Sequence, residues 1–247
     1  MFRQHRLPWI GLLFGYYVSL IVLDLLPVVG VFVAPMVKPV LSVGFLAAAW
    51  TQERGGVPEL RMLFHGFRTN VAALLPLGLV FMLGISLALA STALIDGGQF
   101  LGLLYGAPPA DDTPVAAAQQ MQQTLGNPRV QLAMLFGALC AAPTILALWW
   151  APALVVFQDA RFSAALRGSL RAALGNWRAV VTYALVVFTL GAVVPALVTL
   201  FLAVLVPPPF NGVLTTLVVL PYVAFFVATL HIADYVSYRE VFHPGEK

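Results

Sequence analysis

The sequence predicts an all-α fold: a polytopic membrane bundle of six transmembrane helices in three similar hairpin units. Three observations lead to this prediction: an apolar composition, six long apolar stretches and an uneven distribution of basic residues. Of the 247 residues, 61% are hydrophobic and only 9% are charged, and the mean hydropathy is +0.93. Soluble domains use about a quarter of their residues as Asp, Glu, Lys and Arg. We therefore expect a single integral membrane domain over residues 1–247.

The hydrocarbon core of a bilayer, about 30 Å thick, requires roughly 20 mostly apolar residues per helix. Six stretches approach this length: Leu7–Leu26, Ala34–Trp50, Asn70–Ile95, Arg129–Phe157, Ala179–Val206 and Leu214–Tyr235. The second stretch is short and contains Lys38. Its outer end is expected either at the membrane interface or in a tight hairpin with the first stretch.

The basic residues indicate the orientation of these spans. Eleven of the 13 Lys and Arg residues fall on the side of the chain termini, and only Lys38 and Arg129 fall on the other side. Cytoplasmic loops carry an excess of Lys and Arg, so both termini are predicted to be cytoplasmic. Helical spans indicate the bacterial inner membrane, because outer-membrane proteins are β-barrels. The first stretch lacks a small-residue cleavage site, so we expect it to be retained as a span.

The longest outer segment, residues 96–128, contains three Asp and no Lys or Arg. Thr113 as N-cap, Pro114 in the first turn and Gly126 as the stop predict a short polar helix within it. This helix is a candidate contact for a periplasmic partner, and the alternative is a solvated lid.

Two basic segments on the cytoplasmic side have the pattern of interfacial helices. In residues 160–178, Arg167, Arg171 and Arg178 lie beside an apolar stripe, and Asp159 is the expected N-cap. The stripe consists of Phe162, Leu166, Leu170, Leu174 and Trp177. Residues 58–70 follow the same plan, with Arg61, His65 and Arg68 beside Leu60, Leu63, Phe64 and Phe67. Such helices lie at the level of anionic headgroups. We therefore predict that Arg61, Arg68, Arg167, Arg171 and Arg178 contact anionic lipid or an acidic partner.

Each basic segment leads through an asparagine into an outgoing span. This order predicts three repeat units, at about residues 1–55, 56–158 and 159–242, related by an axis along the membrane normal. The alternative is that any bundle of hairpins has basic cytoplasmic turns.

Several short segments together resemble a known family. They are Leu7–Leu13, Leu26–Gly30, Ser42–Phe45, Leu63–Arg68 and Ser169–Ala172. In these segments the chain resembles a proteobacterial family of six-span inner-membrane proteins of unassigned function. More distantly, it is similar to the membrane domain of some glycerophosphodiester phosphodiesterases. Since the family has no established activity, the resemblance implies a fold but no catalytic residues.

Ionisable residues within the apolar stretches are candidate intramembrane polar sites. Asp24 and Lys38 are expected to pair across the first hairpin or to be hydrated at headgroup depth. His231 and Asp234, with Tyr235, indicate either a proton-relay or ligand-binding cluster or ordinary polar residues near the interface.

Small residues and prolines suggest how the spans pack. Gly11 and Gly15 form a GxxxG pattern, which makes a homo-oligomer a possibility beside packing within the chain. Gly84/Ala88 and Gly137/Ala141 are weaker pairs of this kind. Five prolines within apolar stretches are candidate kinks or breaks: Pro76, Pro143, Pro152, Pro195 and Pro221.

The sequence excludes several classes of function. Metalloprotease, serine-hydrolase and P-loop motifs are absent, and the single cysteine, Cys140, excludes a disulfide or thiol cluster. We expect no enzymatic activity, no metal, no cofactor and no nucleic-acid binding. The leading prediction is an accessory or organising membrane protein that acts through membrane lipids or a membrane-protein partner. The alternative is a small transporter or channel with a path between the repeats.

Overall fold

The computed structural model describes residues 2–26, 29–106, 114–243 and 245. The predicted all-α class is confirmed, since the described residues are almost entirely helical and contain no β-strand. Six helical segments are long and apolar enough to cross a membrane. They are α1 (Arg6–Asp24), α2 (Val29–Glu53), α3 (Val71–Asp96), α6 (Pro128–Trp149) with α7 (Ala151–Gln158), α9 (Trp177–Phe188) with η3 (Thr189–Val193) and α10 (Val194–Leu205), and α11 (Pro208–Phe242).

Shorter helices connect these segments. η1 (Phe2–Gln4) precedes α1, η2 (Leu60–Arg68) precedes α3, and α8 (Phe162–Gly175) precedes α9. The helix α5 (Pro114–Gly126) matches the predicted polar helix, whose expected N-cap, Thr113, lies outside the described residues. The helix α4 (Gln99–Tyr105) was not predicted; Asp96 begins it by accepting bonds from the amides of Gly98 and Phe100, both 2.8 Å long.

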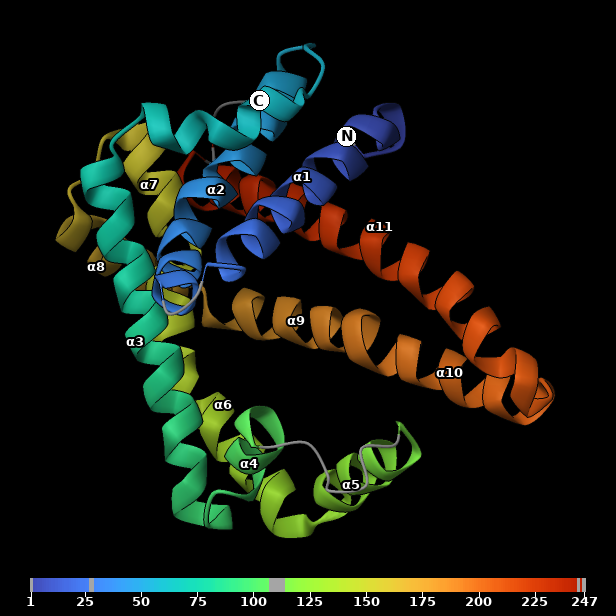
Figure 1. The fold of residues 1–247 in the computed structure, drawn as a ribbon. Helices are drawn as coiled ribbons and strands as arrows, with labels where there is room; N and C mark the ends of the chain where they lie inside the picture. Colours follow the sequence, from blue (N-terminus) through green and yellow to red (C-terminus); the bar gives the residue numbers. More distant parts are fainter. Residues whose placement is uncertain (1, 27–28, 107–113, 244, 246–247) are drawn as a thin grey trace.

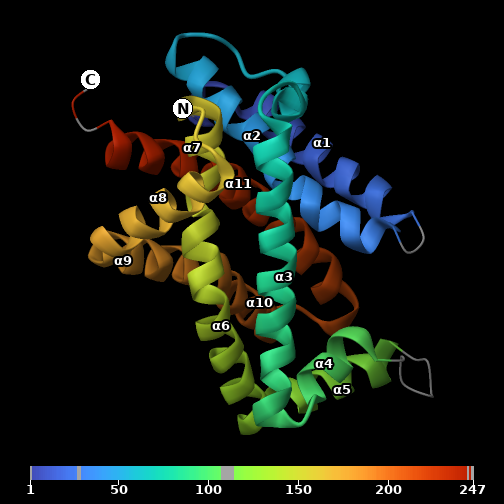
Figure 2. The same cartoon turned by 90° about the vertical axis from the view of Figure 1, so that its left-hand side faces the viewer.

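The spans form three hairpins that meet at the end of the molecule carrying both termini (Figure 1). The pair α3 and α6 extends away from this end, with α4 and α5 at its far tip (Figure 2). The pair formed by α9–α10 and α11 extends as a second arm, which diverges from α3 and α6 (Figure 1). The common end contains the apolar core, whose largest fully buried side chains include Trp9, Phe45, Leu63 and Leu74.

The second span is longer than predicted. It begins at Val29 and ends at Glu53, so Pro35 and Pro39 lie inside the helix. Its second half is almost wholly buried, from Val40 to Ala49. This burial places α2 at the centre of the common end and not at its margin.

The end of α2 reverses the chain and lays η2 back along the helix. Gly55 has a φ of 83°, and the amides of Gly55 and Gly56 bond to the carbonyls of Gln52 and Thr51 at 3.0 and 2.9 Å. This pair of bonds is a Schellman motif, which favours glycine at the left-handed position. Close approach then depends on two further glycines, because a Cβ on Gly44 would meet the Leu63 backbone and one on Gly66 would meet the Val40 carbonyl.

The fourth predicted span is broken at Trp150. A continuous helix would bond the Trp150 amide to the Leu146 carbonyl. Instead, the hydroxyl of Ser169 on α8 accepts from the Trp150 amide at 3.0 Å and donates to the Leu146 carbonyl at 2.8 Å. Insertion of a side chain into the helical ladder is an established cause of kinks. The break turns α7 toward α2 and fixes α8 beside it.

The fifth span also departs from regular α-helix. Thr189–Val193 form a π-helical turn just before Pro195. Proline has no amide hydrogen, so a carbonyl of the preceding turn loses its donor. The Tyr222 hydroxyl of α11 donates to the Leu190 carbonyl at 2.6 Å and supplies the missing bond. The hydrogen bond at this π turn therefore also links α11 to the fifth span.

Small residues bring α3 and α6 together, as the pairs Gly84/Ala88 and Gly137/Ala141 indicated. A Cβ on Gly84 would meet the side chain of Thr144, and a Cβ on Gly137 would lie 2.7 Å from Thr92 Cγ2. On α1 the outcome is different for the GxxxG pattern. Gly15 is covered by the Leu60 and Leu63 side chains, whereas Gly11 faces open space. Of the two glycines predicted to form an oligomer contact, Gly15 is therefore packed within the chain and Gly11 remains open.

Candidate functional site

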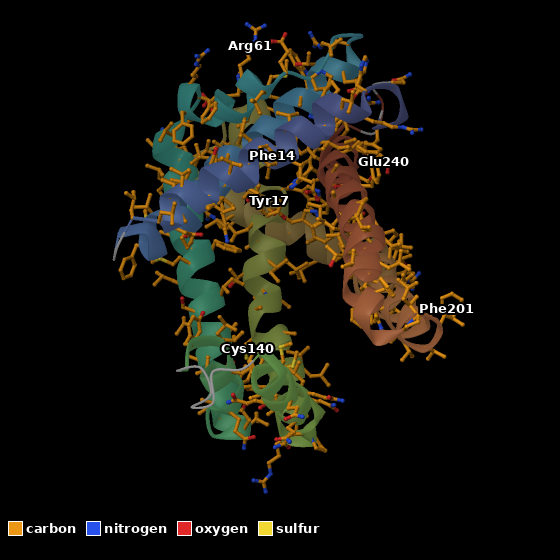
Figure 3. The ribbon with its side chains drawn as sticks, turned by 45° about the vertical axis from the view of Figure 1, so that its right-hand side comes forward. Phe14, Tyr17, Arg61, Cys140, Phe201 and Glu240 are labelled. Carbon is orange, nitrogen blue, oxygen red and sulfur yellow. The ribbon has the colours of Figure 1, made fainter. Side chains whose placement is uncertain are left out.

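The five predicted arginines lie on three different helices in the structure. Arg61 and Arg68 lie on η2 and line a cavity, whereas Arg167 and Arg171 are exposed on α8. Arg178 lies on α9 with its guanidinium carbon 5.5 Å from the centre of the Trp177 ring. Arg61 projects from η2 at the common end of the molecule, the same end that carries Glu240 on α11 (Figure 3).

The geometry of η2 explains why His65 and Arg68 face a cavity together. η2 is a 3₁₀ helix, which repeats every three residues and not every 3.6. One row, Leu63 and Gly66, is therefore buried against α2. The next row brings Met62, His65 and Arg68 to one side. Leu60, Phe64 and Phe67, predicted to form the apolar face with Leu63, are 55%, 46% and 43% exposed. The prediction assumed an α-helical period, whereas the 3₁₀ period places Phe64 and Phe67 on a different row from Leu63.

The cavity beside η2, called the basic cavity below, has a volume of about 620 Å³. Three elements line it: α2, η2 and α7. The lining residues are Ala47, Trp50, Thr51, Arg61, Met62, His65, Arg68, Val156 and Phe157. It therefore combines an apolar wall with three basic side chains. It lies at the level where α3 begins, since only two residues separate the end of η2 from Val71.

Arg61 has an acidic neighbour at the mouth of this cavity. Its Nε lies 2.6 Å from Glu59 Oε2, and its side chain is 77% exposed. Exposed ion pairs of this kind contribute about 0–1 kcal/mol. A phosphate can therefore compete with Glu59 for this guanidinium at little cost.

The helix α8 packs on the rest of the protein through small residues, and part of its predicted apolar stripe is exposed. Its buried row is Ala165, Ser169 and Ala173, while Leu174 and Trp177 are each 58% exposed. Asp159 is not its N-cap; it ends α7 with a φ of 49°, and Arg161 occupies the N-cap position. The Asn70 amide donates to Asp159 Oδ1 at 3.4 Å and so links the starts of α3 and α8.

The predicted intramembrane pair is not formed. Among the described residues no ion pair joins Asp24 to Lys38. Lys38 Nζ instead lies 5.6 Å from the centre of the Phe81 ring on α3, and Asp24 is exposed at the end of α1. The two side chains lie on different helices of the hairpin and face different neighbours.

His231 and Asp234 do lie together, with His231 Nδ1 3.8 Å from Asp234 Oδ2. The imidazole is stacked on the Phe45 ring, with centroids 3.8 Å apart and planes 1° from parallel. Tyr235 points elsewhere, because its hydroxyl donates to Glu53 on α2. The predicted cluster is thus divided between two contacts that fasten α11 to α2.

Glu53 is the centre of a second polar group that the sequence did not reveal. It accepts from Tyr235 and forms an ion pair with Arg239. These residues line a neighbouring cavity of about 630 Å³. Its lining residues are Trp50, Glu53, Arg54, Phe157, Tyr235, Tyr238, Arg239 and His243. The sequence signal for this group is the adjacent charged pair Glu53 and Arg54 at the end of an apolar stretch. Arg54 contributed only to the predicted orientation.

Three further cavities lie elsewhere. One, beside α3 and α6, and one on α10 are lined almost wholly by apolar or small residues. The third lies between Trp149, Tyr183 and Glu240. Asp24 and Lys38 line none of these five cavities.

Six apolar helical segments and a basic cavity at the end of a span define an integral membrane protein of the α-helical class. The chain is 28% identical over 246 residues to a probable inner membrane protein of Burkholderia thailandensis, across 98% of this chain and 87% of that relative. The resemblance to inner-membrane proteins is thereby supported. No comparison supports the similarity to the membrane domain of glycerophosphodiester phosphodiesterases.

No family model matches the chain. No solved structure matches it either.

Proposed function

We propose that this protein is a non-enzymatic accessory or organising component of the inner membrane, and that it acts by binding an anionic phospholipid in the basic cavity. The observation that carries the proposal is the lining of this cavity, where Arg61, His65 and Arg68 face an apolar wall. Guanidinium groups bind phosphate through paired, charge-assisted hydrogen bonds. An apolar wall beside them suits the start of an acyl chain.

The position of the cavity agrees with this ligand. α3 is 26 residues long and begins just beyond η2, so η2 lies at the membrane boundary if α3 spans the bilayer. Anionic headgroups are enriched in the cytoplasmic leaflet, which attracts clustered basic residues. The proposal therefore includes the predicted orientation, with both termini and η2 on the cytoplasmic side.

The proposal is tested by removing the cavity charges. Arg61→Gln with Arg68→Gln is expected to weaken retention of phosphatidylglycerol by at least about tenfold, which corresponds to the loss of one or two charge-assisted hydrogen bonds. Retention is measured by native mass spectrometry of the detergent-purified protein, with phosphatidylcholine as the neutral lipid.

The matched control is Arg167→Gln with Arg171→Gln, which removes the same charge from exposed positions outside the cavity. The control is expected to retain the lipid as the unmodified protein does. Equal losses in the two double variants would show a diffuse charge effect and would refute a site in the cavity. Unchanged retention in both would refute the proposal as a whole.

Glu59 provides a prediction of opposite sign. Glu59→Gln removes the carboxylate that competes for Arg61, so retention of phosphatidylglycerol is expected to rise by about two- to fivefold, the range of an exposed ion pair. Glu240→Gln makes the same charge change on α11, at a residue outside the basic cavity. An equal rise in both variants would mean that net charge alone controls binding.

A further inference from the structure

The basic cavity and its neighbour are separated by a shared wall. Trp50 of α2 and Phe157 of α7 line both cavities, which have volumes of about 620 and 630 Å³. The two cavities therefore lie back to back at the common end. A ligand that extends around Trp50 can enter both.

The two cavities differ in how their charges are used. In the neighbouring cavity, Arg239 is paired with Glu53, and His243 lies 3.3 Å from the Tyr238 hydroxyl. Arg54 has no carboxylate partner among the described residues, and its guanidinium carbon lies 4.1 Å from the centre of the Trp50 ring. Its charge is thus held at the shared wall, across from the basic side chains of η2.

We infer that the two cavities together bind a phospholipid with two phosphodiester groups joined by a glycerol bridge, a diphosphatidylglycerol. One phosphate lies with Arg61, His65 and Arg68, and the other lies with Arg54. This inference rests on the proposed function, because it assigns a lipid class to the same basic cavity. It adds that a lipid with one phosphate leaves Arg54, the fourth of these basic groups, without a phosphate.

The experiment compares lipids with one and two phosphates on the same protein. Native mass spectrometry of the full chain is performed with diphosphatidylglycerol, phosphatidylglycerol and phosphatidylcholine in equal amounts. The unmodified protein is expected to retain diphosphatidylglycerol about tenfold more strongly than phosphatidylglycerol, the gain expected from one further charge-assisted contact. Equal retention of the two anionic lipids would overturn the inference but leave the proposed function intact. If the unmodified protein retains neither anionic lipid more strongly than phosphatidylcholine, the proposed function itself is overturned.

Arg54 provides the residue-level test. Arg54→Gln is expected to abolish the tenfold preference while leaving retention of phosphatidylglycerol unchanged, and Arg54→Lys is expected to restore part of it because it restores the charge. Arg171→Gln on α8 is the control of equal charge change. A parallel loss of both anionic lipids in Arg54→Gln would show a structural role at the Trp50 wall and would contradict the inference.

Discussion

Gly44→Ala is expected to destabilise the protein and release η2 from α2. A Cβ at this position would lie 2.8 Å from the Met62 carbonyl oxygen and 2.9 Å from the Leu63 carbonyl carbon. These are backbone atoms, which cannot rotate away as a side chain can. Overpacking of this kind costs about 1–3 kcal/mol, and it outweighs the helix-propensity gain of about 1 kcal/mol for glycine to alanine. The midpoint of thermal unfolding in detergent is expected to fall by several degrees.

Gly11→Ala is the matched control for this change. Both glycines lie inside helices, but a Cβ on Gly11 meets nothing within 4 Å. Here only the propensity gain remains, so the unfolding midpoint is expected to stay the same or to rise slightly. Gly44→Ala is also expected to weaken phosphatidylglycerol retention, because the basic side chains are carried by η2. A stable Gly44→Ala variant with full lipid retention would show that η2 is not held in this way.

The apolar spans could be predicted from the sequence because the bilayer imposes a length and a composition on each of them. The departures from regular helix could not, because each depends on a contact between distant residues. The break at Trp150 is bridged by the hydroxyl of Ser169, which lies 19 positions away. The π turn before Pro195 is completed by Tyr222, 32 positions from Leu190. A proline suggests that a helix can break, but only the tertiary partner decides how.

The side chains of the candidate site could also be predicted only in part from the sequence. Arg61 and Arg68 were predicted because their charges stand out in an apolar sequence. Trp50 and Phe157, which separate the two cavities, are aromatic residues in apolar stretches and look like any other core position. The 3₁₀ helix η2 packs closely against Gly44 and Val40 of α2, which are distant from it in the sequence. Local periodicity could therefore find the basic residues but not the surface that they line.

Ser169→Ala is expected to have an effect as large as that of Gly44→Ala, by loss of polar contacts rather than by overpacking. Ser169 is fully buried and bridges the Trp150 amide and the Leu146 carbonyl. Alanine leaves both backbone groups without this bridge, and an unpaired buried polar group costs about 1–3 kcal/mol. A loss of about 2–4 kcal/mol in unfolding free energy is therefore expected, measured by thermal or denaturant unfolding in detergent.

The consequence of Ser169→Ala for the site distinguishes this bridge from general destabilisation. Without the hydroxyl, the bridge that fixes the start of α7 to α8 is lost. We expect α7 then to shift relative to α2 and to displace Val156 and Phe157 from the wall of the basic cavity, so lipid retention falls even at temperatures below the unfolding midpoint. Ser163→Ala, at an exposed position on the same helix, is expected to change neither property. A destabilised Ser169→Ala variant with unchanged lipid retention would show that α7 keeps its place without the bridge.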